Sequence, residues 1–404
     1  MNTHLPRIAL ALLLLLAIGR ADDWPQWRGP HRDGISTEQG WSTAWPTEGP
    51  ARIWEATVGI GFSSVAVAQG RLYTLGNTNE TDTVWCFDAA TGTLKWQHAY
   101  PCPLDPQYYE GGPGSTPTVD GGQVYTLGKR GQLFRFDAAS GKVDWEVTLT
   151  NVLGVWKPRW GFAGSPLVAG DRLILNAGAA GTAIEKATGR VLWSSGTNAA
   201  GYATPVPVTL EGTPCALIFA AKALVAVQLS DGHELWRVPW ITKWDLNTAD
   251  PIVAGDLVYV SSFDRSGTLL RLRGRQPPEI VYECQGIANH FNSCVLLDGL
   301  LYGIDGNSDA PPKDLRCVDL RTGQVKWTQE GFGLGSLTIA DRKLIVLGDK
   351  GELVVAPATG EGFKPLARAQ VLGGKCWTVP VLANGRLYCR NAAGHLVCLN
   401  LKTP

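Results

Sequence analysis

The sequence predicts an all-β protein, an eight-bladed β-propeller made of four-stranded antiparallel blades. A motif recurs at intervals of about forty residues, a spacing typical of repeat architectures. Each copy opens with two apolar strands joined by an Asp-Gly, Asn-Gly or Gly-Asp turn, which is a strong hairpin signal. The last copy stops before its fourth strand, and a matching strand stands near the N-terminus. Four short strands per copy are typical of a propeller blade.

The opening strands of the eight copies can be placed in order along the chain. They begin near Val65, Pro117, Pro166, Pro205, Pro251, Val295, Leu337 and Pro380. A third strand follows, which ends in an acidic or amide residue before a Thr-Gly-type turn. The fourth strand carries a tryptophan four residues after the glycine, as in Phe87-Asp88-Ala89-Ala90-Thr91-Gly92 followed by Trp96.

The repeated glycine and tryptophan have clear structural roles. Glycine supplies a positive φ at the turn without steric cost. An indole on the outer strand can cover the seam to the next blade and donate its N–H to a backbone carbonyl. We therefore expect inter-blade packing from Trp54, Trp96, Trp145, Trp193, Trp236 and Trp327.

Three copies depart from the pattern. The fifth has Tyr282 in place of the tryptophan, and the seventh is eroded around Thr359-Gly360. The eighth ends at Leu399-Asn400, which leaves a strand edge unpaired. Because exposed edges promote aggregation, we expect Arg52 to Val58, with Trp54 in the tryptophan position, to supply the missing strand and close the ring.

The N-terminus predicts export. Arg7 precedes an unbroken apolar run from Ile8 to Ile18, and Gly19-Arg20-Ala21 provides small residues for a cleavage site. The run is shorter than the roughly 20 residues that span a bilayer, and no cysteine follows it to carry a lipid. We expect a signal peptide over 1–21, an extension over 22–50 and a single propeller domain over 51–404, periplasmic or secreted and monomeric.

Charge and cysteine content exclude several classes of function. Lysine plus arginine equals aspartate plus glutamate at 36 each, which argues against a nucleic-acid partner and an electrostatic membrane role. Cys86, Cys317 and Cys398 share one repeat position and are expected to be strand residues. Cys284 and Cys294 are predicted not to bond to each other. If any pair forms a disulfide, the expected pair is Cys389 with Cys398.

One face of the ring is rich in aromatic and charged residues. The loops between blades share this side with the loops between second and third strands, whereas the Thr-Gly turns lie opposite; we call it the inter-blade face. Aromatic rings mixed with polar groups around a funnel are typical of a ligand site. The alternative is that the rings only plug the channel mouth. The ligand-binding candidates are Glu110, Arg159, Trp160, Lys243, Trp244, Asp245, Asn289, His290, Asn292, Lys375 and Trp377.

Among these candidates, the expected ligand contacts are Trp160, Trp244, His290 and Trp377, with charge from Arg159 or Lys375. The histidines show no metal-ligand spacing, so no metal site is predicted. No catalytic residue can be assigned from the residues alone.

The Asp-Ala-x-Thr-Gly-x-x-x-Trp repeats resemble those of the PQQ-type (quinoprotein) eight-bladed propellers. The start Asp23-Trp24-Pro25-Gln26-Trp27-Arg28-Gly29-Pro30 resembles exported members of unknown function, and the resemblance runs from about Trp24 to Leu399. Related branches are the outer-membrane-assembly lipoprotein BamB and the quinoprotein alcohol dehydrogenases. The dehydrogenase resemblance would imply PQQ and calcium, an aspartate base and a Cys-Cys disulfide over the quinone. This chain has no adjacent cysteines.

Two functions follow from these expectations. The first is a non-enzymatic scaffold that binds a small molecule, a carbohydrate or a periplasmic protein through the inter-blade face. The alternative is a PQQ-dependent oxidoreductase similar to the alcohol dehydrogenases, for which Glu110, Asn289, Asn292, Asp245 and Asp250 are residues of the right type for calcium or the base.

Overall fold

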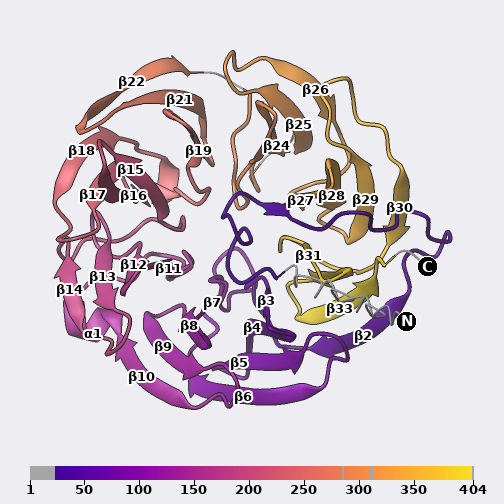
Figure 1. Ribbon diagram of the computed structural model, residues 1–404, viewed down its shortest axis with the longest axis horizontal. Helices are drawn as coiled ribbons and strands as arrows, with labels where there is room; N and C mark the ends of the chain where they lie inside the picture. The colour runs from indigo at the N-terminus through magenta and orange to yellow at the C-terminus, as the bar shows by residue number, and fades with distance from the viewer. Residues whose placement is uncertain (1–22, 284–285, 310, 312, 403–404) are drawn as a thin grey trace, which may run out of the picture.

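The computed structural model describes residues 23–283, 286–309, 311 and 313–402. These residues form eight antiparallel sheets arranged as a ring, with helical structure limited to α1 (Leu149–Leu153) and the 3-10 turn η1 (Lys243–Asp245). Figure 1 shows the blades around a central axis, with the first strand of each blade innermost. The predicted eight-bladed, all-β propeller is confirmed.

The first four blades each follow the chain from the inner to the outer strand. Blade one is β3 (Ala66–Ala68), β4 (Arg71–Thr78), β5 (Thr81–Asp88) and β6 (Leu94–Pro101). Blade two is β7 (Thr118–Asp120), β8 (Gln123–Leu127), β9 (Gln132–Asp137) and β10 (Val143–Thr148). Blade three is β11 (Leu167–Ala169), β12 (Arg172–Leu175), β13 (Thr182–Glu185) and β14 (Val191–Ser194). Blade four is β15 (Val206–Leu210), β16 (Thr213–Ala220), β17 (Ala223–Gln228) and β18 (Glu234–Pro239).

The second half of the ring repeats this order, except that its last blade borrows a strand. Blade five is β19 (Ile252–Ala254), β20 (Leu257–Ser262), β21 (Arg265–Arg273) and β22 (Gln276–Glu283). Blade six is β23 (Val295–Leu297), β24 (Leu300–Asp305), β25 (Asp314–Asp319) and β26 (Val325–Gln329). Blade seven is β27 (Ser336–Ala340), β28 (Lys343–Leu347), β29 (Glu352–Pro357) and β30 (Ala367–Gln370). Blade eight is β31 (Val381–Ala383), β32 (Arg386–Arg390), β33 (His395–Asn400) and β2 (Arg52–Thr57).

The repeated tryptophans join each blade to the next. The indole Nε1 of Trp96 in blade one donates to the carbonyl of Ala138 in blade two at 3.0 Å. The ring lies on the turn glycine, since a Cβ on Gly141 (φ 73°) would stand 2.5 Å from Trp96 Cδ2. Glycine is therefore needed there both for its φ and for the close approach of the indole.

The same contact recurs around the ring. Equivalent indole–carbonyl hydrogen bonds link Trp54 to Ala89, Trp145 to Lys186, Trp193 to Leu229 and Trp327 to Thr359, at 2.7–3.2 Å. Tyr282 takes the tryptophan position in blade five, as expected, and its hydroxyl donates to the Leu320 carbonyl at 2.6 Å.

Trp236 differs from the other docking tryptophans. Its ring is buried, but its Nε1 has no hydrogen-bond partner among the described residues. The next blade explains the difference, because β21 and β22 are joined by a tight hairpin in which Arg273 pairs with Gln276 instead of an acidic residue and Thr-Gly turn. The expected packing of Trp236 is present, and its polar contact is not.

The ring closes as predicted through the N-terminal strand β2. This strand pairs antiparallel with β33, and Trp54 stands opposite Cys398. Arg390 of β32 adds a second connection, because its guanidinium donates to the carbonyls of Gly59, Ser63 and Leu75 at 2.6–3.0 Å. Burial lowers the pKa of Arg390 to about 9. The last blade is thus tied to the first both by a strand and by a buried cation.

The segment before β2 fills the central channel. Trp24 forms a bridge with Val67 of β3, and the Pro25 carbonyl accepts the Val119 amide of β7 at 2.7 Å. Farther along, β1 (Ile35–Ser36) pairs in parallel with β27. Figure 1 shows this indigo segment crossing the centre of the ring. Inner strands of blades one, two and seven therefore contact a single central chain.

The same segment also supplies a tryptophan to the eroded seventh blade, whose outer strand has none. Trp41 is buried in an apolar cluster formed by blades seven and eight, and the Lys343 ammonium lies 5.2 Å from its ring centroid.

The domain boundaries expected at residues 21 and 50 stay predictions, and the predicted signal peptide lies outside the described residues. No helix in the described part of the chain is long and apolar enough to cross a membrane.

The described cysteines are all free and buried. Cys86, Cys317 and Cys398 stand opposite Trp96, Trp327 and Trp54, which confirms their common place in the repeat. The preference for a Cys389–Cys398 disulfide was wrong. Cys398 pairs with Tyr388 and Cys389 with Val397, so the two thiols lie on opposite faces of the hairpin, because neighbouring side chains alternate along a strand. Cys284, and with it the expectation about Cys284 and Cys294, lies outside the described residues.

The inter-blade contact gives a first prediction. Trp96→Ala should lower the free energy of unfolding by about 3–5 kcal/mol, since it removes a buried ring and leaves a cavity. Trp156→Ala is the matched control, because Trp156 is 71% exposed and its loss should cost under about 0.5 kcal/mol. Urea unfolding measures both; equal losses would contradict the docking role.

Ring closure gives a second prediction. A chain that begins at Gly59 lacks β2 and leaves the β33 edge unpaired, so it should aggregate. A chain that begins at Ala51 keeps β2 but lacks the central segment, and should remain monomeric with lower stability. Size-exclusion chromatography compares the two; similar monomeric behaviour of both chains would show that β2 is not needed for closure.

Candidate functional site

The inter-blade face contains a cavity at the ring axis with a volume of about 380 Å³. Loops that enter the inner strands converge there, so each brings its side chains to the same point. The lining includes rings from seven of these eight loops: Phe62, Tyr109, Trp160, Tyr202, Trp244, His290, Phe291 and Trp377. The loops of the inter-blade face therefore line a cavity with largely aromatic walls.

One wall of the cavity is a stack of four rings, with a fifth ring in contact at one end. Phe291 lies between His290 and Trp377, with centroid distances of 3.7 and 4.2 Å. Trp377 also stacks on Phe62 at 5.4 Å, and Phe62 contacts Tyr109 at 5.5 Å. These rings come from the loops before blades one, two, six and eight. The stack therefore joins segments that are far apart in the sequence.

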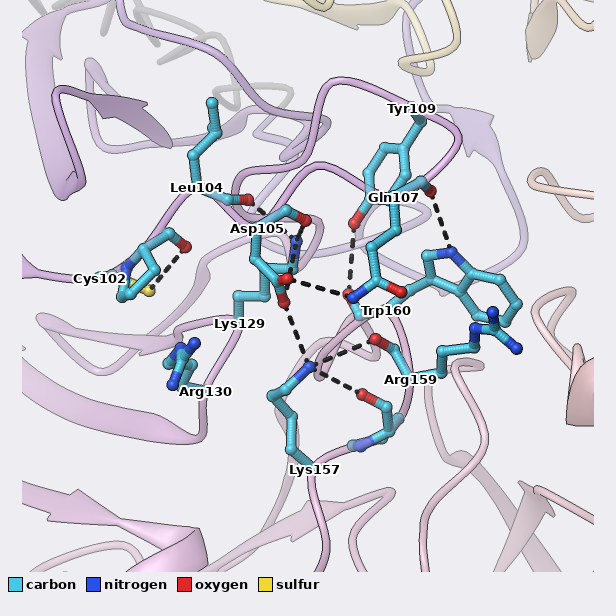
Figure 2. A network of polar contacts seen from close by, with 12 residues as sticks. Cys102, Leu104, Asp105, Gln107, Tyr109, Lys129, Arg130, Lys157, Arg159 and Trp160 are labelled. Carbon is cyan, nitrogen blue, oxygen red and sulfur yellow. Dashed lines mark hydrogen bonds and ion pairs between the residues drawn. The ribbon is translucent and has the colours of Figure 1, made fainter.

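The adjoining wall, which shares Tyr109 with the stack, is held by a polar network, drawn in Figure 2. Lys129 is buried and donates from Nζ to the carbonyls of Leu104 and Asp105 at 3.0 and 2.8 Å. The Asp105 carboxylate also accepts from Lys157 at 3.3 Å. Burial lowers the pKa of Lys129, although nearby Asp105 acts in the opposite direction. These contacts fix the loop between β6 and β7 against the loop that follows β10.

Two reciprocal hydrogen bonds set the rings of this wall. Trp160 donates from Nε1 to the Gln107 carbonyl at 3.2 Å, and the Tyr109 hydroxyl donates to the Trp160 carbonyl at 3.2 Å. Each loop thereby orients the aromatic residue of the other. The wall is consequently organised before any ligand arrives.

The floor of the cavity is made by the central N-terminal segment. Trp27 lines the cavity and donates from Nε1 to Asp250 Oδ2 at 2.6 Å. The other carboxylate oxygen accepts the Thr204 amide at 2.7 Å, and Arg28 Nε stands 3.9 Å away from Oδ2. Burial raises the pKa of Asp250, against the opposing effect of Arg28. This carboxylate is engaged in anchoring the floor.

His290 is a neutral wall residue. Burial lowers its pKa to about 3, and the positive charge of Lys313 contributes in the same direction. Its Nδ1 accepts the Ser308 amide at 3.1 Å, which places the ring proton on Nε2. The ring can therefore stack and donate one hydrogen bond, and it is unsuited to accept a proton near neutral pH.

The cavity brings together some of the residues predicted from sequence. Trp160, Lys243, Trp244, His290, Asn292 and Trp377 line it. Arg159 lies outside the lining, with its guanidinium over the rings of Trp160 and Trp244 at 5.2 and 4.7 Å. Lys375 and Glu110 form an ion pair of 2.8 Å, and Lys375 lies over Trp377 at 4.3 Å.

Two predicted residues are placed elsewhere. Asn289 is 1% exposed and holds backbone and hydroxyl groups of blades five and six, through Ser261 at 2.6 Å and the Ile304 carbonyl at 3.2 Å. Asp245 belongs to η1 and is not part of the lining. Composition identified the face on which this cavity lies but could not tell which polar groups already have structural partners.

Other lining residues, above all Trp27, are not among those predicted from the sequence. It lies in the segment expected to be an extension, and only its position in the Trp24-Pro25-Gln26-Trp27 cluster set it apart. The two tryptophans of this cluster were the available signal. Its place beneath the cavity depends on the threading of the channel, which no local pattern reveals.

Comparisons with known proteins agree with the fold. A family described as outer membrane protein assembly factor BamB matches residues 38–150 and 80–329. No curated protein sequence matches the chain. Solved structures that are similar share 15% identity or less in the three cases that follow, so they support the fold alone.

BamB from Moraxella catarrhalis has a TM-score of 0.64 at 15% identity, covering 87% of this chain and 99% of its own. Quinohemoprotein alcohol dehydrogenase from Comamonas testosteroni has a TM-score of 0.69 at 14% identity, covering 95% and 81%. The computationally designed Ika8 protein has a TM-score of 0.57 at 13% identity, covering 85% and 98%.

The buried histidine predicts a pH dependence of stability. The unfolded chain takes up a proton at His290 below its ordinary pKa of about 6.5, whereas the folded protein does so only near 3. The unfolded state therefore binds more protons between these values, and the free energy of unfolding should fall as the pH falls through this window.

The His290→Gln variant removes this titration and keeps a hydrogen-bond acceptor. Between about pH 7 and pH 4.5 the parent should lose about 2 kcal/mol more stability than the variant. Urea unfolding at both pH values measures the difference. Equal losses would mean that His290 is not the neutral, buried group described above.

Proposed function

Since the chain belongs to the family described as outer membrane protein assembly factor BamB, we propose that it is an exported binding propeller whose working surface is the inter-blade face. We further propose that the axial cavity holds a small organic molecule with a flat ring. The observation that carries this proposal is the cavity of about 380 Å³ with aromatic walls and a closed floor. Pockets for small ligands are typically about 300–1,000 Å³, largely apolar, with a few placed polar groups.

The export that this proposal includes rests on the apolar run from Ile8 to Ile18 and on the small residues before a cleavage site near Ala21. A monomer without a lipid anchor fits the same proposal. Carbohydrates and quinones are both suitable ring-bearing ligand classes, because each presents a flat face to a tryptophan.

A protein partner on the same face is the second candidate. Tyr108, Trp156, Ile241 and Trp244 are large residues of this face with exposed fractions of 50–89%. Clusters of exposed apolar side chains often mark protein-interaction surfaces. In that case the rings around the cavity mouth would bind side chains of the partner.

A PQQ-dependent oxidoreductase, the remaining alternative, does not fit the donor groups of this site. Asp250 is engaged by Trp27 and Thr204, and Glu110 by Lys375. Asn289 is buried, and its side-chain oxygen already accepts from the Ser261 hydroxyl at 2.6 Å. In the described residues no three His, Cys, Asp or Glu side chains are grouped to hold a metal ion.

Binding can be tested with a panel of quinones and oligosaccharides, followed by tryptophan fluorescence. Stacking on one ring is worth about 1–3 kcal/mol in base-stacking cases, so Trp244→Ala should weaken binding of any hit roughly tenfold to a hundredfold. Trp377→Ala should have a similar effect.

Trp156→Ala is the control, because this exposed tryptophan lies on the same face outside the lining. It should leave the affinity unchanged. Binding that survives both cavity substitutions, but is lost when the Thr-Gly turns are altered, would place the ligand on the opposite face.

A further inference from the structure

The cations around the mouth of the cavity differ in how they are neutralised. Three are paired with carboxylates: Lys157 with Asp105 at 3.3 Å, Lys243 with Asp309 at 3.8 Å and Lys375 with Glu110 at 2.8 Å. Arg159 differs from these three, since it has no carboxylate within 4.0 Å among the described residues, a property that it shares with Lys313 near His290. In Figure 2 its guanidinium extends beside Trp160 without a polar contact.

Aromatic rings surround the Arg159 guanidinium instead. Its Cζ lies 4.7 Å from the ring centroid of Trp244, 5.2 Å from Trp160 and 5.9 Å from Tyr108. Rings attract the flat faces of a guanidinium, whereas its five N–H donors point outward in the plane. This arrangement holds the cation in place and leaves its donors available. Those donors match a carboxylate or another oxyanion in geometry and charge.

Two of these three rings are held in an unfavourable backbone conformation. Tyr108 has a φ of 65° and Trp244 a φ of 68°, a region that bulky side chains rarely adopt. Both rings are largely exposed, at 89% and 50%, so core packing does not explain their placement. Strained backbone at exposed residues is common where a ligand is held. The feature that these two residues share is contact with Arg159.

The cavity wall contains a further unmatched polar atom. Thr378 lines the cavity and is 4% exposed, and its Oγ1 has no hydrogen-bond partner among the described residues. Buried hydroxyls are normally hydrogen-bonded. A ligand with a polar atom on its ring would satisfy this group, and an entirely apolar ligand would not.

From these observations we propose that Arg159 is the anion-binding residue of the cavity, and that the natural ligand is a ring-bearing molecule with a carboxylate or similar oxyanion. The ring enters the aromatic cavity, and the anionic group remains at the mouth on the guanidinium. This inference rests on the proposed function, because it names the class of ligand for the same cavity.

Two isosteric probes separate the ring from the charge: naphthoate and its uncharged analogue naphthamide. Titrations at low ionic strength, followed by tryptophan fluorescence, should show naphthoate binding about tenfold tighter. Added salt should reduce this preference, because an exposed charge pair is screened. Arg159→Gln should weaken naphthoate to the level of naphthamide and leave naphthamide unchanged, while Arg159→Lys should retain part of the preference.

Arg52→Gln is the matched control. Arg52 is an exposed arginine on the outer strand β2, paired with Glu55 at 2.5 Å, and its substitution should change neither affinity. Thermal unfolding of each variant checks that the ring is intact.

The possible failures are distinguishable. Equal binding of both probes, lost in Trp244→Ala but unaffected in Arg159→Gln, would overturn the anion site and leave the proposed cavity function standing. A preference for naphthoate that persists in Arg159→Gln would also overturn it. If neither probe binds at about 1 mM, both the anion site and the ring-binding cavity are contradicted.

Discussion

The fold depends on one repeated interaction, in which a tryptophan on the outer strand of one blade packs on the next blade and donates a hydrogen bond to it. Each indole combines three requirements: a carbonyl to accept its N–H, a glycine on which the ring can lie, and apolar strands beneath it. Trp96, Ala138 and Gly141 meet all three. A blade by itself buries only part of its apolar surface, so its stability depends on its neighbours. In a closed ring every blade packs on two neighbours, provided that the last blade also packs on the first.

The N-terminal segment completes the last blade and also shapes the candidate site. As β2 it completes blade eight, and upstream of β2 it occupies the channel. A propeller channel open at both ends would be a water-filled pore. Because Trp27 is anchored on Asp250, the channel becomes a cavity with a floor. Structural closure and the candidate binding site are therefore built from the same stretch of chain.

Much of the fold could be predicted because each blade leaves its own local signal. The unused Trp54 and the truncated eighth copy predicted the closing strand, and Tyr282 was placed correctly from spacing alone.

The site was predicted less completely. Loop composition identified the face and six lining residues, but Asn289 and Glu110 look the same in sequence whether they are free or already paired. Trp27 could not be predicted at all, because its position depends on a contact more than two hundred residues away, with Asp250. The misplaced preference for Cys389 and Cys398 shows a related limit, since one residue of register decides which face a thiol occupies.

The pairing of β2 with β33 also has a consequence for how the protein is made. These strands lie at opposite ends of the propeller sequence, and contacts of such separation carry a high loop-closure entropy and form late. A strand that is synthesised early is consequently among the last to pair. Until then, a nearly complete ring has one unpaired sheet edge, along β33, and an N-terminal segment that is still outside the channel. Folding of this chain therefore ends with a single joining step, in which the sheet edge is covered and the axis is filled together.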